Sequence, residues 1–165
     1  MARVFAVSLA QEIVELAIAK SVILTTAESC TGGMVSAALT DIAGSSAMFE
    51  RGFVTYSNAA KVEMLGVEPL TLDQVGAVSE EVAAQMAHGA RRAAKADIAV
   101  SITGIAGPGP SEHKPEGRVC FGVATADGVQ AVTHDFGALG RGQVRENSVQ
   151  TALELLNAAL IQDCS

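Results

Sequence analysis

Hydrophobic and polar positions along the chain follow first a helical and then a strand-like spacing. Apolar side chains recur every three or four residues over 7–20, which predicts a helix. The uninterrupted, β-branched run at 22–26 predicts a short buried strand. A turn rich in Gly, Ser and Thr occupies 27–33, and 34–39 returns to helical spacing. This order of strand, turn and helix is typical of α/β folds.

The rest of the chain continues the same alternation, with turn residues between the segments. Gly66 stands at a helix C-terminus, and Ser79 stands where a helix N-cap is expected. The predicted elements are an extended segment at 47–56, helices at 58–65, 79–95 and 140–161, and strands at 97–102, 118–125 and 129–136. With 165 residues and no repeat or linker, the chain is predicted to be a single α/β domain.

Composition narrows the possible partners. The chain is 49% hydrophobic but only 4% aromatic and contains 16 glycines, which favours tight helix-on-sheet packing. A net charge of −7 disfavours nucleic acid and anionic membranes as partners. A small phosphorylated ligand remains compatible, since it needs only a local group of hydrogen-bond donors.

Cysteine usage and the N-terminal residues bear on the compartment. Three cysteines without a CxxC pair indicate a reducing environment rather than a disulfide framework. Glu12 and Glu15 interrupt the first apolar segment, which favours an amphipathic helix over a signal peptide. No run approaches the ~18 apolar residues of a membrane span. We therefore expect a cytoplasmic protein.

Two loops that follow buried strands share a composition rich in Gly, Ser and Thr: Ser29–Gly33 and Thr103–Gly107. Ligands of open α/β sheets bind beyond the carboxyl ends of strands, so we predict that these loops form two walls of one pocket. The first loop could present backbone N–H groups to an anion or an oxyanion, or it could be a plain turn that caps a helix. It has neither the GK[ST] ending of a P-loop nor the GxSxG spacing of a hydrolase elbow.

A second group of reactive residue types comprises Ser45, Ser46, Tyr56 and Lys61. A desolvated lysine can lose its proton and serve as base to a serine nucleophile. The alternative is a surface lysine near a half-buried tyrosine, and the spacing alone does not decide between them.

Other titratable residues give no recognisable catalytic or metal-binding pattern. His88, His113 and His134 lack the partners of a triad, and no HxxxH, HExxH or carboxylate cluster suggests a metal. Cys30 could be a nucleophile but is expected to pack in the core, and Asp97 could be catalytic but is expected to be a cap or loop residue at the head of a strand. No metal and no cofactor are therefore predicted.

Four long, ordered blocks stand out along the chain: AESCTGG at 27–33, AGSS at 43–46, FVTYSNAAK at 53–61 and SITGIAGP at 101–108. Together they closely resemble the CinA C-terminal domain family, and the resemblance extends from about residue 8 to 160. It implies a three-layer α/β/α sandwich. For stand-alone members it also implies hydrolysis of the carboxamide of nicotinamide mononucleotide to nicotinate mononucleotide and ammonia, in pyridine nucleotide recycling, without a metal.

The resemblance also implies roles for individual residues. Lys61 corresponds to the base and Tyr56 to an assisting group. Ser46 and Ser29 compete as nucleophile; Ser46 is favoured, with Ser29 in orientation or proton relay. Candidates for holding the ribose phosphate or the oxyanion are Thr31, Gly32, Gly33, Thr103 and Gly104, with Arg145 as a phosphate ligand in its own subunit or across an interface.

Alternative functions remain open at this stage. The chain could be a non-catalytic nucleotide-binding or regulatory module, as suggested by the family's link to bacterial competence, or an amidase for another pyridine amide. A homo-oligomer is expected. The molybdopterin-binding-like domain of two-domain members is expected to be absent. The segment 107–117 is shorter than is usual in the family, which bears on substrate affinity.

Overall fold

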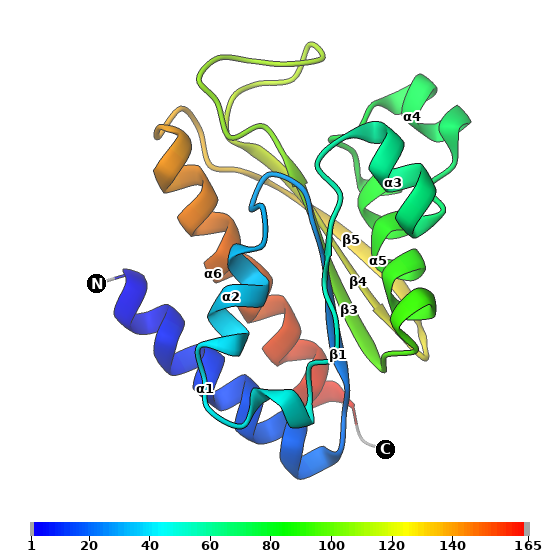
Figure 1. The fold of residues 1–165 in the computed structure, drawn as a ribbon. Coiled ribbons are helices and arrows are strands. Elements are labelled where there is room, and N and C mark those ends of the chain that lie inside the picture. The colour runs from blue at the N-terminus through cyan, green and yellow to red at the C-terminus, as the bar shows by residue number, and fades with distance from the viewer. Residues whose placement is uncertain (1, 164–165) are drawn as a thin grey trace.

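A mixed five-stranded sheet with the strand order β2-β1-β3-β4-β5 forms the centre of the computed structural model, which describes residues 2–163 (Figure 1). Strand β1 is parallel to both neighbours, β2 and β3, whereas β3, β4 and β5 are antiparallel. The strands are β1 (Leu24–Glu28), β2 (Phe53–Val54), β3 (Ile98–Gly104), β4 (Arg118–Thr125) and β5 (Gly128–Asp135). The carboxyl ends of β1 and β3 therefore lie side by side.

Helices cover both faces of this sheet, so the expected three-layer α/β/α sandwich is confirmed (Figure 1). One layer contains α1 (Ala2–Lys20), α2 (Met34–Thr40) and α6 (Arg141–Gln162). The other contains α3 (Asn58–Leu65), α4 (Pro69–Val75) and α5 (Glu80–Ala94). A short 3-10 helix, η1 (Ser45–Ala47), precedes the segment that leads to β2.

Glycines allow the close packing between α5 and its neighbours that the composition predicted. A Cβ atom on Gly89 would lie 1.8 Å from the carbonyl oxygen of Leu65 in α3. A Cβ atom on Gly122 in β4 would lie 2.4 Å from the carbonyl oxygen of Ala83. Real side chains do not approach backbone atoms so closely, so a larger residue would push α5 away from α3 at Gly89 and away from the sheet at Gly122.

Most predicted elements are confirmed within a few residues. Asn58–Leu65 forms the expected helix, and Gly66 ends it in the left-handed conformation with a φ of 70°. The Ser79 hydroxyl caps α5 by accepting from the backbone N–H of Val82. The helix α4 was not predicted, because it buries none of its residues and therefore lacks a clear apolar stripe.

The predicted extended segment at 47–56 is correct only in part. Its beginning belongs to η1, Phe49 forms an isolated parallel bridge with Leu24, and Phe53 and Val54 form β2. Gly52 passes so close to the sheet that a Cβ atom there would lie 2.6 Å from the Thr26 hydroxyl oxygen. This close approach accounts for the irregular backbone before β2.

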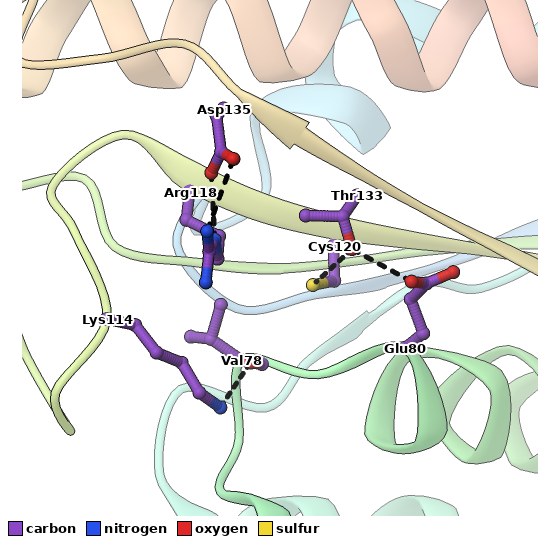
Figure 2. Close-up of polar contacts among 7 residues, drawn as sticks. All are labelled: Val78, Glu80, Lys114, Arg118, Cys120, Thr133 and Asp135. Atoms are coloured by element: carbon purple, nitrogen blue, oxygen red, sulfur yellow. Dashed lines mark hydrogen bonds and ion pairs between the residues drawn. The ribbon is translucent and has the colours of Figure 1, made fainter.

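The loop between β3 and β4 is fastened to the rest of the molecule at several points. Figure 2 shows Lys114 donating to the carbonyl oxygen of Val78, in the connection between α4 and α5. Nearby, Thr133 donates to Glu80 and contacts the Cys120 thiol (Figure 2). The Lys114 bond therefore joins the β3–β4 loop to the connection before α5, and the Thr133 bond joins β5 to the start of α5.

Residues 2–163 contain neither a membrane-spanning helix nor a cluster of metal-binding side chains. No helix there is long and apolar enough to cross a membrane. No group of three or more His, Cys, Asp or Glu side chains in the same residues could hold a metal ion.

Candidate active site

A pocket of about 340 Å³ opens at the carboxyl ends of β1 and β3, where the sequence predicted it. It is lined by Ser29, Cys30, Tyr56, Asn58, Lys61, Ala77, Val78, residues 103–112 and Arg141. The two predicted loops thus face one space, although the first contributes only its first two residues. A larger hollow of about 460 Å³ lies between the β4–β5 turn and the end of α6, but its lining contains no serine, cysteine or lysine.

Glu28 organises the turn that follows β1. This fully buried carboxylate accepts from the backbone N–H groups of Val35 and Ser36 at 2.9 and 3.0 Å. It also accepts from the N–H of Gly33 at 3.2 Å and from the Ser36 hydroxyl at 2.8 Å. The N-terminus of α2 therefore already holds a negative charge that belongs to the protein, which is the arrangement that the helix dipole favours.

Lys61 reaches Ser29 from α3 through the core. Its side chain is only 1% exposed, and its Nζ lies 3.0 Å from the Ser29 Oγ. The same Nζ donates to the carbonyl oxygen of Thr55 at 2.9 Å. The parallel pairing of β1 with β2 produces this geometry, because Glu28 is in register with Val54 and the next residues, Ser29 and Thr55, remain adjacent.

Burial determines the protonation of Lys61. Desolvation lowers the pKa of its ammonium group below the usual value, while Cys30 and Glu112 oppose this shift more weakly. Lys61 makes no ion pair within residues 2–163. An amine without a nearby carboxylate partner readily loses its proton, so it can act as a base toward the adjacent hydroxyl.

The structure places Ser29 beside Lys61, whereas Ser46, the serine favoured as nucleophile, lies elsewhere; the roles of the two serines stay predictions. Ser46 is exposed on η1, and the neighbouring Met48 accepts from the N–H of Leu24 at the start of β1. Ser29 instead follows the last residue of β1. At about 3.3 Å per residue, a five-residue strand separates the two serines by on the order of 15 Å.

Tyr56 lies at the mouth of the pocket rather than beside the lysine amine. Its side chain is 60% exposed, and its hydroxyl oxygen accepts from Arg141 at 2.8 Å. Thr103 and Gly104 line the pocket as predicted. The Thr103 hydroxyl is buried and donates to the carbonyl oxygen of Ala77 at 2.9 Å, so it holds the pocket wall together.

The remaining residues of the first loop, Thr31, Gly32 and Gly33, do not line the pocket, and their role in substrate binding stays a prediction. The N–H of Gly32 donates to Ser29, that of Gly33 donates to Glu28, and Thr31 is completely buried. Arg145 is occupied within its own chain, donating to the carbonyl oxygens of Cys30 at 3.0 Å and Thr31 at 3.3 Å. These residues therefore shape the turn.

Cys30, Asp97 and the three histidines, which the sequence did not favour as catalytic residues, have the following surroundings. Burial raises the pKa of the Cys30 thiol to about 11, so the sulfur stays protonated in the core at neutral pH. The side chain of Asp97, just before β3, accepts from the backbone N–H of Ile23, just before β1, and so links the starts of the two strands. His88 and His113 are exposed, and His134 packs against Phe121.

The sequence did not indicate two charged residues that line the pocket. Arg141 and Glu112 both line it, from the start of α6 and from the β3–β4 loop. Arg141 precedes the predicted Arg145 by one helical turn, and nothing in the local sequence distinguishes which of the two faces the pocket. Glu112 lies in the β3–β4 loop, whose hydrophobic and polar residues follow no regular spacing, so the sequence did not indicate that it lines the pocket.

This fold and site define a class: a three-layer α/β/α protein with a buried lysine–serine pair beneath a small-molecule pocket. The family model for the CinA C-terminal domain matches residues 6–160. The chain belongs to this family.

Several relatives are similar over most of the chain. Nicotinamide-nucleotide amidohydrolase PncC of Escherichia coli K12 is 54% identical over 146 residues, which cover 88% of each protein. A CinA-like protein of a Mycobacterium species is 55% identical over 139 residues, which cover 83% of this chain but 33% of that protein. The crystal structure of a competence/damage inducible protein from Agrobacterium tumefaciens superimposes with a TM-score of 0.91 at 48% identity, covering 95% of this chain and 96% of that one.

Proposed function

We propose that this protein is a nicotinamide-nucleotide amidase that hydrolyses nicotinamide mononucleotide to nicotinate mononucleotide and ammonia. Ser29 is the nucleophile and Lys61 the general base. One observation carries the proposal: a buried lysine amine without a carboxylate partner lies 3.0 Å from a serine hydroxyl in the pocket. The similarity to proteins named nicotinamide-nucleotide amidohydrolase supports the choice of substrate.

The first half-reaction forms an acyl-enzyme. The neutral amine of Lys61 takes the proton of Ser29 as Oγ attacks the carboxamide carbon. The backbone N–H groups of Cys30 and Ala106 belong to residues that line the pocket, and within residues 2–163 they donate to no backbone carbonyl of another residue. They are our candidates for stabilising the tetrahedral oxyanion, at roughly 3–4 kcal/mol per well-placed donor.

The first half-reaction ends when the ammonium of Lys61 returns its proton to the leaving nitrogen, so that ammonia departs as the C–N bond breaks and the acyl-enzyme remains. In the second half-reaction, the again neutral Lys61 takes a proton from a water molecule, whose oxygen attacks the ester carbon. The ammonium of Lys61 then gives this proton to the Ser29 Oγ as the ester C–O bond breaks and the carboxylate product departs. Tyr56 contacts Arg141 rather than Lys61, so we assign it to substrate binding at the mouth instead of proton relay.

The proposal is tested by measuring ammonia release from nicotinamide mononucleotide by the wild type and by Lys61→Met, after treatment with a chelator. We expect release by the wild type and a loss of several orders of magnitude in the variant. Binding of the nucleotide without release by the folded wild type would contradict the proposal and favour the non-catalytic module.

We also propose that the protein forms a homo-oligomer in the cytoplasm. The first turns of α1 expose Val4, Phe5 and Val7, which are 73%, 61% and 51% accessible. Burial of these side chains against a second copy would be favourable. Light scattering coupled to size exclusion tests the assembly, and a strictly monomeric protein at high concentration would contradict it.

A further inference from the structure

Arg141 holds an unusual position at the mouth of the pocket. It is exposed at the first position of α6. One nitrogen of its guanidinium group, Nη1, donates to the carbonyl oxygen of Gly107 at 2.7 Å, and the other, Nη2, donates to the hydroxyl of Tyr56 at 2.8 Å. Both acceptors are neutral, and no carboxylate pairs with Arg141 within residues 2–163.

The charges around the pocket set Arg141 apart. Its lining contains two basic side chains, Lys61 and Arg141, and one acidic side chain, Glu112. Burial lowers the pKa of Lys61, whereas a guanidinium group stays protonated in proteins. The lining side chain that keeps a positive charge is therefore Arg141, which is exposed, whereas Lys61 is buried.

We propose that Arg141 binds the phosphate of the substrate and thereby selects the mononucleotide over the same amide without a phosphate. This inference rests on the proposed amidase function. A planar guanidinium group presents two parallel N–H donors that match two phosphate oxygens. Hydrogen bonds to a charged acceptor are stronger than those to neutral ones, so a phosphate can displace the carbonyl of Gly107 and the phenol of Tyr56.

The order of the groups along the substrate fits this assignment. A mononucleotide has its reactive amide at one end and its phosphate at the other. The pocket likewise has Ser29 and Lys61 in its interior and Arg141 at its opening. The displaced hydroxyl of Tyr56 becomes free to donate to the same phosphate. This exposed side chain would then also bind the substrate at the mouth of the pocket.

Arg145, the residue predicted from the sequence as phosphate ligand, provides a matched control. It lies one turn further along α6, and its donors are held by the carbonyl oxygens of Cys30 and Thr31. It does not line the pocket. Arg145→Gln should therefore disturb the turn that carries Ser29 and affect phosphorylated and unphosphorylated substrates alike.

The test compares kcat/KM for nicotinamide mononucleotide and for nicotinamide riboside, the same amide without phosphate. In Arg141→Gln, we expect the preference for the mononucleotide to fall by about 10- to 100-fold, the range for loss of a hydrogen bond to a charged group. Arg141→Lys should restore part of this preference, and Arg145→Gln should leave the ratio unchanged. An unchanged ratio in Arg141→Gln would overturn the inference.

A binding experiment separates this inference from the proposed catalysis. Calorimetric titration of Ser29→Ala, with and without Arg141→Gln, measures affinity for both compounds without turnover. The preference for the mononucleotide should fall in the double variant, even if the wild type releases no ammonia. Equal affinity losses for the two compounds would contradict phosphate recognition by Arg141.

Discussion

The carboxylate of Glu28 and the hydroxyl of Ser29 leave the end of β1 toward opposite helical layers. Glu28 accepts from the first turn of α2, whereas the Ser29 Oγ lies 3.0 Å from Lys61 in α3. Successive residues of an extended chain point to opposite faces of the sheet. Two adjacent residues can thus anchor the turn on one face and present a nucleophile on the other.

Glu28→Ala should reduce the free energy of unfolding by about 2 kcal/mol or more, measured by urea denaturation. The buried carboxylate accepts four hydrogen bonds, and its removal leaves the donors of Gly33, Val35 and Ser36 without their acceptor. The exposed Glu12 serves as control, since Glu12→Ala should change stability by less than about 0.5 kcal/mol. Equal stability of the two variants would contradict this account of the turn.

The pH dependence of kcat/KM should report the protonation of Lys61. Catalysis requires the neutral amine, so activity should rise with pH as the ammonium of Lys61 loses its proton. Glu112 raises the pKa of Lys61 against the larger effect of burial. Glu112→Gln should therefore move the acid limb of the profile to lower pH. Glu116→Gln, in the same loop, is the control, and a shift to higher pH in Glu112→Gln would contradict the assignment.

Stability should depend on pH through the same lysine. The pKa of Lys61 is lower in the folded state than its ordinary value of 10.5, so the unfolded chain binds more protons between these two values. The free energy of unfolding of the wild type, minus that of Lys61→Met, should therefore increase with pH in this window, by at most about 1.4 kcal/mol per pH unit. Denaturation of both proteins from pH 7 to 10 measures it, and a constant difference would contradict the buried, deprotonated lysine.

Lys114 should control the position of the β3–β4 loop over the pocket. Its Nζ donates to the carbonyl oxygens of Val75, at 2.6 Å, and Val78 (Figure 2). In Lys114→Ala we expect KM to rise several-fold, with faster proteolysis within 107–117, because the loop loses this attachment. Lys95→Ala, at the opposite end of α5, is the control. Unchanged KM and proteolysis in Lys114→Ala would show that the loop is held by other contacts.

The local pattern of the sequence was sufficient for most elements and for the pocket. Strands at 22–26 and 97–102 were recognised from their buried β-branched runs, and the rule that ligands bind beyond strand ends located the two loops. The partner of Lys61 could not be deduced in this way. It depends on β2 pairing in parallel with β1, which places Thr55 beside Ser29 and leaves Ser46 at the other end of the strand.

The same limit applies to the two arginines of α6. Arg141 and Arg145 share one side of the helix, and only the position of the helix end relative to the pocket separates them. That position is set by tertiary packing of α6 against β3, β4 and α1. Local spacing carries no information about it.

The assignment of Ser29 as nucleophile is tested most directly by the initial rate of ammonia release from nicotinamide mononucleotide in Ser29→Ala and Ser46→Ala. Because the hydroxyl of Ser29 lies 3.0 Å from the buried amine of Lys61, replacement of Ser29 should lower the rate by about 10³-fold or more. Ser46→Ala should retain activity within about threefold, since its side chain is exposed on η1. Loss of activity in Ser46→Ala, with near-normal rates in Ser29→Ala, would contradict the Ser29–Lys61 mechanism.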